Sequence, residues 1–103
     1  MDLDDLIAVA TERLPDPLAV EVVKRLRAGA DEYQADDGSQ PILFRSLPGL
    51  VAEATEEVAD AIVYLNVVRS RLRDGNPVKV RLTEAVLQLI TAHELIARAG
   101  RMM

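Results

Sequence analysis

The stretch of residues 50–68, LVAEATEEVADAIVYLNVV, constrains the fold of this chain more than any other. Its apolar residues recur at helical spacing on one face, and the far side is small or apolar apart from Thr55 and Asn66. A helix that is apolar nearly all round is usually a buried one. Because no strand-like alternation is found elsewhere, the sequence predicts an all-α domain in which this stretch is central.

Helix bounds follow from apolar spacing and from proline, glycine and capping residues. The predicted helices are 2–14, 16–33, 47 or 48 to 73, and 82–99. Ser46 is expected to cap the third helix and Thr83 the fourth, with Gly100 ending the fourth. The residues 74–77, DGNP, predict a turn. Together these signals indicate one domain, 1–103, of about four helices in a bundle that dimerisation completes.

The charge balance and the cysteine count narrow the classes of function. Net charge is −5 and the isoelectric point is near 4.8, whereas a protein that binds a nucleic-acid backbone is expected to be basic. With no cysteine there is neither a disulfide nor a thiolate metal site. No apolar run is long enough for a membrane span, and the N-terminus is acidic. We expect a soluble, cytoplasmic protein that binds neither membranes nor polymeric nucleic acid.

An acidic stripe runs along the central helix. Its members share one face at helical spacing: Glu53, Glu56, Glu57 and Asp60. Like charges four residues apart repel, and burial raises that cost unless the acids are paired, protonated or bound to metal. The first basic residue of this helix is Arg69. Carboxylates without cysteine suit Mg²⁺ or Mn²⁺ better than zinc, so the stripe predicts a metal site inside an assembly or lining a cleft. The alternative is an ordinary solvated acidic face.

The segment GSQPILFRSLPGL, followed by the acidic stripe in the order E-x-x-E-E-x-x-D and then by Tyr64-Leu65, resembles a known family. It is similar to the core of the all-α nucleoside triphosphate pyrophosphohydrolases, the MazG-like superfamily, in its short phage and bacterial form. The resemblance covers about residues 38–68. It implies a helical bundle that dimerises or tetramerises, holds Mg²⁺ with acids from two helices, and splits a nucleoside triphosphate into monophosphate and pyrophosphate. By position, Glu57 and Asp60 match the E-x-x-D pair of the family.

The chain also departs from this family pattern. Classical members carry a further E-x-x-E pair on the preceding helix, where this chain has Glu21 followed by Lys24. Three possibilities remain for the missing acids. They come from Asp31, Glu32 or Asp36, or they come from a second chain. In the third possibility they are absent and catalysis has been lost.

Other side chains are candidates for contacts with a nucleotide. The basic candidates for the triphosphate are Lys24, Arg27 and Arg45, of which Arg45 is preferred because it directly precedes the acidic helix. Phe44 and Tyr33 are candidates for stacking on a base, or for packing at the edge of the core. Each of the basic residues has a plain surface role as its alternative.

Helical spacing also predicts positions for three further polar residues. Tyr64 either bonds a carboxylate of the acidic stripe or packs in the core. We expect His93 at the surface or at an interface, and Asn66 as a buried polar group that sets helix register in an oligomer.

Three functions therefore compete at the level of sequence. The leading one is Mg²⁺-dependent nucleoside triphosphate pyrophosphohydrolysis by a homodimer or higher homo-oligomer. The second is a non-catalytic helical module of the same fold, a phage or regulatory protein whose acidic stripe faces solvent or a basic partner. The third is a sensor that binds nucleotide or cation without hydrolysis. Pyrophosphate release separates the first from the third, and metal binding separates the third from the second.

Overall fold

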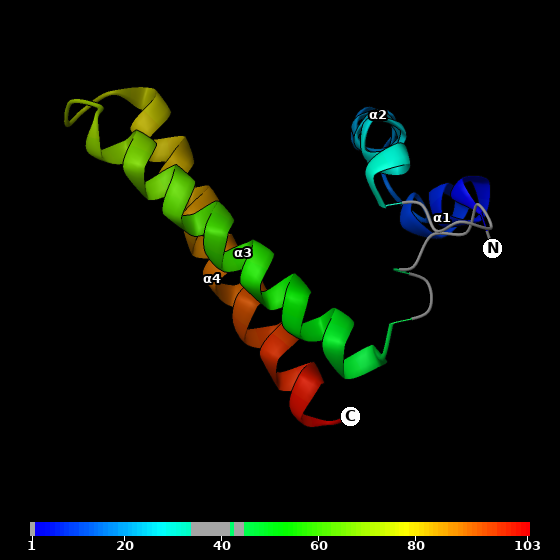
Figure 1. Cartoon of the computed structure of the whole chain (residues 1–103). Coiled ribbons are helices and arrows are strands. Elements are labelled where there is room, and N and C mark those ends of the chain that lie inside the picture. Colours follow the sequence, from blue (N-terminus) through cyan, green and yellow to red (C-terminus); the bar gives the residue numbers. More distant parts are fainter. Residues whose placement is uncertain (1, 34–41, 43–44) are drawn as a thin grey trace. The chain divides into compact units, whose positions relative to one another are not determined.

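The computed structural model describes residues 2–33, 42 and 45–103, and for residues 30–33 it describes the backbone alone. The described residues form helices and turns without a strand, which confirms the all-α class (Figure 1). They fall into two compact units, Met1–Arg45 and Ser46–Met103, each of which is described by itself.

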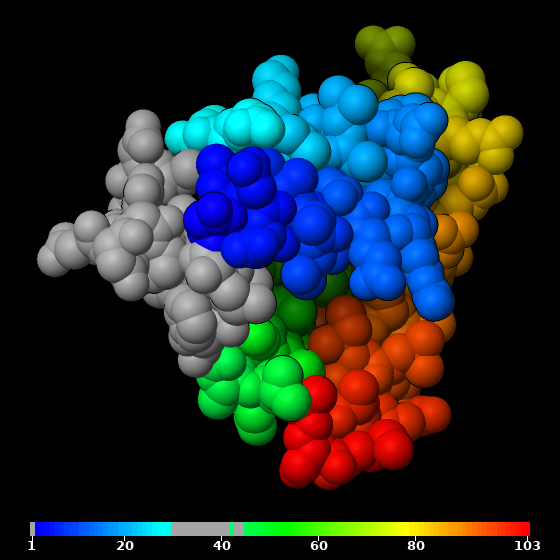
Figure 2. Space-filling model, turned by 90° about the vertical axis from the view of Figure 1, so that its right-hand side faces the viewer, coloured from blue at the N-terminus to red at the C-terminus, as the bar shows by residue number. Residues whose placement is uncertain are grey.

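The first unit contains α1 (Leu3–Ala10) and α2 (Asp16–Tyr33), which pack against each other (Figure 2). A capping box starts α1: Asp5 N donates to Asp2 Oδ1 at 3.1 Å, and Asp2 N donates to Asp5 Oδ2 at 2.9 Å. Hydrogen bonds from Asp5 hold the pKa of Asp2 below its usual value. The buried apolar residue of this unit is Leu6, at 8% exposure.

The predicted range of the first helix, 2–14, was too long. The helix ends at Ala10, and Thr11 caps it with its backbone N–H on Ile7 O. Arg13 then adopts a left-handed backbone, with φ of 62°, and this reverses the chain before α2 begins. The bounds predicted for α2 agree with the structure at both ends.

The second unit is a hairpin of two long helices, α3 (Leu47–Ser70) and α4 (Pro77–Arg101), which run side by side in opposite directions (Figure 1). Ser46 caps α3 as predicted, since its Oγ accepts from Gly49 N at 3.2 Å. The helix ends at Ser70 and not at residue 73, because Arg71 forms the cap. Gly75 provides the turn between the helices with a φ of 87°, which favours glycine.

The fourth helix begins earlier than predicted. Asn76 is its N-cap, with Oδ1 accepting from Val78 N at 2.9 Å, and Pro77 lies in the first turn, where its missing N–H has no consequence. Thr83 is therefore not a cap: it lies inside the helix, and its Oγ1 donates to Lys79 O at 2.9 Å. Gly100 is also helical, and Met102 forms the C-cap.

A narrow seam holds α3 and α4 together. Val86, at 5% exposure, is the buried residue of α4. At one end Arg69 Nε donates to Thr83 Oγ1 at 3.0 Å. At the other end a Cβ built on Gly100 would lie 3.1 Å from Val51 Cγ1, so glycine permits the close approach of the helices there. Among the described residues only Leu6 and Val86 are buried apolar side chains, and neither is completely enclosed, so the core is small.

Candidate functional site

The acidic stripe lies on the side of α3 that faces away from α4. The seam residues Val51 and Arg69 contact α4, and the four acids are on the opposite side of the helix. Glu53, Glu56, Glu57 and Asp60 are all exposed. The prediction that they share one face agrees with the observed helix, which covers them without interruption. Within the chain they are not inside a core, so the predicted enclosure would have to come from an assembly.

Three of the four acids of the stripe have no cationic partner within the described part of the chain. Glu56, Glu57 and Asp60 form no hydrogen bond or ion pair with a described residue, whereas Glu53 does have an interaction. The first basic residue of α3, Arg69, is engaged elsewhere: it donates to Thr83 and, through Nη1, to Asn66 Oδ1 at 2.7 Å. The stripe is therefore a row of exposed carboxylates, of which those of Glu56, Glu57 and Asp60 have no described partner.

The stripe alone does not form a metal site. Its carboxylate oxygens are of the type that Mg²⁺ prefers. Among the described residues, however, no three acidic or histidine side chains converge closely enough to hold a metal ion. A straight helix face brings acids together only in pairs three or four residues apart, so further ligands must come from another element. The predicted sources Asp31, Glu32 and Asp36 have side chains outside the described residues.

The candidate residues of α2 are exposed within the chain. Glu21, the acid nearest to the position of the family's missing pair, accepts from Arg25 Nε at 3.2 Å in an exposed i,i+4 ion pair. Lys24 and Arg27 are exposed on the same helix. Arg45 is exposed at the end of the first unit and is not without a partner.

The aromatic candidates differ in what the structure shows. Tyr33 has no described side chain, and Phe44 lies outside the described residues. Tyr64 is 74% exposed, so it does not pack in the core. Its hydroxyl also makes no hydrogen bond to a described carboxylate, and neither predicted role of Tyr64 is seen within the chain. It projects from the outer side of α3, one turn beyond Asp60.

Two further polar residues of the hairpin have described positions. His93, expected at the surface or at an interface, is half-buried. It lines a hollow of about 190 Å³ with Ala59, Ile62 and Ile90. Asn66 is exposed within the chain and accepts a hydrogen bond from Arg69, and its expected role in an oligomer stays a prediction.

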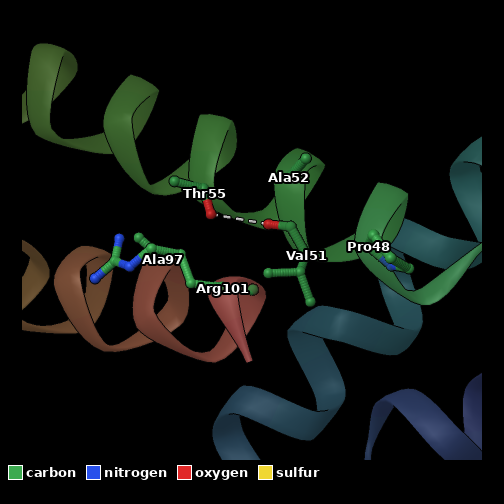
Figure 3. Close-up of a pocket in the computed structure, with 7 residues that line it drawn as sticks. Pro48, Val51, Ala52, Thr55, Ala97 and Arg101 are labelled. Atoms are coloured by element: carbon green, nitrogen blue, oxygen red, sulfur yellow. Dashed lines mark hydrogen bonds between the residues drawn. The ribbon is translucent and has the colours of Figure 1, made fainter. Parts of the chain in front are cut away.

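A larger hollow, missed by the sequence, lies where the start of α3 meets the end of α4 (Figure 3). It measures about 370 Å³, and its lining is mostly apolar: Pro48, Val51, Ala52, Thr55, Ala97, Gly100 and Arg101. Thr55 Oγ1 donates to Val51 O at 2.8 Å, so its hydroxyl is already satisfied. Gly100 lies at this hollow, where the lack of a side chain lets the two helices approach closely. The charged residue of the lining is Arg101, and the acidic stripe takes no part in the hollow.

Comparisons with protein-family models, with curated proteins and with solved structures found no match to this chain. The resemblance to the MazG-like superfamily therefore stays a prediction from the motif. Among the described helices, none combines the length and the apolar character that crossing a membrane requires.

Proposed function

We propose that the chain hydrolyses nucleoside triphosphates to monophosphate and pyrophosphate with Mg²⁺ or Mn²⁺, using the acidic stripe of α3. The observation that carries this proposal is the row of exposed carboxylates, three of which have no described partner. Like charges four residues apart repel by a few tenths of a kcal/mol even on an exposed helix, and a hard divalent cation with its bound phosphates is a suitable counter-charge. The motif E-x-x-E-E-x-x-D supports the same chemistry through its family resemblance.

We assign the parts of this reaction to the stripe by position. Glu57 and Asp60, one turn apart on the same face, would bind the cation. Bound Mg²⁺ would supply a Lewis acid and a template for the phosphates. Glu53 or Glu56, one turn earlier, would orient a water and accept its proton as the water oxygen attacks the α-phosphorus. The new P–O bond would form while the bond from the α-phosphorus to the α,β-bridging oxygen breaks, and pyrophosphate would leave with that electron pair.

Pyrophosphate release from a panel of ribo- and deoxyribonucleoside triphosphates tests this proposal. Glu57→Gln and Asp60→Asn each remove one metal-binding oxygen without changing side-chain volume, and we expect both to abolish Mg²⁺-dependent release. Glu94→Gln, at an exposed position of α4, is the matched control and should leave release unchanged. Unchanged turnover in both stripe variants would contradict the assignment.

A second candidate function is a non-catalytic interaction module, and the exposure of the outer side of α3 favours it. Tyr64 is accompanied there by Val63, which is 60% exposed, and by the less exposed Val67 and Val68. Exposed apolar side chains beside a charged row are typical of a protein interface. This function predicts no pyrophosphate release and no stabilisation by metal, and neutralising the acids should stabilise the protein in any buffer.

A further inference from the structure

The end of α3 and the start of α4 carry the same short pattern, which the proposed function does not use. Residues 68–72 read VRSRL and residues 78–82 read VKVRL. Each copy is thus a valine, a basic residue, a variable residue, an arginine and a leucine. The turn that contains Gly75 lies between the two copies, at one end of the hairpin (Figure 1). We call residues 68–82 the hairpin tip.

The basic residue at the second position of each copy turns inward and holds the hairpin together. Arg69 of α3 donates a hydrogen bond to Thr83 of α4 at 3.0 Å. Lys79 of α4 donates to Asp74 at 2.7 Å and, across the turn, to the backbone oxygen of Leu72 at 3.5 Å. These bonds place the two copies at the same level along the hairpin, and in each copy the second residue faces the other helix.

The apolar residues of the two copies therefore lie on one face of the hairpin. Because the helices run in opposite directions, a half turn about an axis normal to the hairpin carries one copy onto the other, and that rotation leaves each face on its own side. The two valines of this face are open to solvent, with Val68 46% exposed and Val78 53% exposed. Leu72 and Leu82 beside them are half-buried. The centre of the face is apolar.

Arginines flank this apolar centre on both sides. Arg71 and Arg81, the fourth residue of each copy, are exposed and lie on the outer edges of the face, one turn after the valines. Arg71 has no described partner. Arg81 pairs with Glu84 of its own helix at 3.1 Å, in an exposed ion pair of the kind that contributes little to stability. The hairpin tip contains five basic residues and one acidic residue, in a chain whose net charge is −5.

We propose that the hairpin tip binds an acidic amphipathic helix of another protein, which lies along the groove between α3 and α4. Its apolar stripe packs on the valines and leucines, and carboxylates on both sides of that stripe pair with Arg71 and Arg81. An amphipathic helix laid in a groove is a common form of recognition, and the arginine fork matches a carboxylate with two parallel hydrogen bonds. The apolar centre provides most of the attraction, while the charges fix the orientation. This inference stands without the proposed function.

Phosphate-rich partners fit this face less well. Its centre is apolar, whereas a nucleic-acid backbone or a layer of anionic lipid headgroups presents charge over its whole surface. The hairpin tip also has no aromatic residue to stack on a base or to anchor in a membrane interface. A long polyanion would extend along α3 toward Asp60, which lies about 16 Å from Arg71 along the helix, and the acidic stripe would repel it. A short acidic helix confined to the hairpin tip avoids this repulsion.

Fluorescence anisotropy of a labelled peptide with the full chain tests the proposal. The probe is a helical peptide of about five turns, with leucine along one face and glutamate on both sides of that face. We expect saturable binding that weakens as ionic strength rises, and no binding of the same peptide with lysine in place of glutamate. Arg71→Glu combined with Arg81→Glu should weaken binding by about tenfold or more, because attraction becomes repulsion on both edges. Val68→Ser combined with Val78→Ser should also weaken it, because the apolar centre is lost.

Matched controls separate this effect from net charge and from loss of fold. Arg98→Glu combined with Arg101→Glu makes the same charge change at exposed positions near the end of α4, and should leave binding unchanged. Circular dichroism should show that all variants keep the helical content of the parent. The inference would be overturned by no binding of the acidic peptide, by equal binding of the tip and control variants, or by tighter binding of duplex DNA or of phosphatidylserine vesicles. Self-association of the parent that the arginine substitutions at the tip abolish would overturn it as well. None of these results bears on pyrophosphate release, so the two proposals fail separately.

Discussion

The inner and outer sides of α3 use polar residues in different ways. On the inner side, Arg69 donates hydrogen bonds to Thr83 and Asn66, and Thr55 donates one to a backbone carbonyl. All of these bonds lie within the hairpin. On the outer side, Glu57 and Asp60 have no described partner and Arg71 is exposed. This difference indicates that the inner polar groups stabilise the chain itself. The outer groups are available for a ligand or for a second molecule.

The largest effect that sharpens this comparison should come from a charge placed in the helix seam. Val86→Asp introduces a carboxylate at a site that is 5% exposed and has no partner for it. We expect a loss of about 3–5 kcal/mol in the free energy of unfolding, the usual penalty of an uncompensated buried charge. Leu87→Asp is the control, since the next residue is 60% exposed, and it should change stability little. Equal losses in urea denaturation would show that the seam is not where the hairpin is held.

Arginine substitutions compare the two sides directly. Arg69→Ala removes the hydrogen bonds to Thr83 and Asn66 and should lower the free energy of unfolding by about 1–2 kcal/mol. Arg71→Ala removes an exposed side chain with no described bond, so at protein concentrations low enough to avoid association its effect should be near zero. Urea titrations of both variants provide the measurement. A larger effect at Arg71 than at Arg69 would invert the comparison.

Neutralising one acid should slightly stabilise the protein in metal-free buffer. Glu57→Gln relieves repulsion with Glu53, four residues earlier on the same helix, by a few tenths of a kcal/mol. Salt screens exposed charges, so the gain should shrink as ionic strength rises. Thermal melts of parent and variant at low and high salt measure it. Destabilisation at low salt would mean that Glu57 already has a favourable partner.

The smallest effect concerns the turn between α3 and α4. Lys79 Nζ bonds Asp74 Oδ1 at 2.7 Å, and this hydrogen bond with its charge lowers the pKa of Asp74. Because this pKa is lower in the folded state than in the unfolded state, the ionised Asp74 stabilises the fold at pH values above its unfolded-state pKa. That contribution is lost as the pH falls through its folded-state pKa. Asp74→Asn should therefore flatten the acid side of the stability profile slightly. Carboxyl titration by NMR should find the pKa of Asp74 below its usual value in the parent and at that value in Lys79→Ala.

Local signals predicted much of the fold. Short-range interactions between neighbouring residues determine three features that were predicted: Ser46 as a cap, the turn at residues 74–77 and both ends of α2. The start of α4 was missed because Pro77 was treated as part of the turn, although proline fits the first turn of a helix as well as it ends one. The end of α1 was missed because a left-handed backbone is usually signalled by glycine, whereas here the residue that adopts it is Arg13.

The candidate site was predictable only in part. Helical spacing places the acids on one face, and this needs no tertiary information. Which side of α3 meets α4 does need it, because apolar residues occur on both sides, and Val63 and Val67 are as apolar as the seam residues Val51 and Ile62. The surroundings of His93 and Asn66 need tertiary information for the same reason, since each depends on a neighbour across or along the hairpin.

The measurement that tests the acidic stripe most directly is the melting temperature of the parent and of Glu57→Gln, with and without Mg²⁺ and non-hydrolysable nucleoside triphosphate analogues. A ligand at about a hundred times its dissociation constant adds ~2.7 kcal/mol, or several degrees for a domain of this size. We predict a rise of that order in the parent that requires both metal and nucleotide and is lost in Glu57→Gln. No rise in the parent, or an equal rise in the variant, would contradict the account.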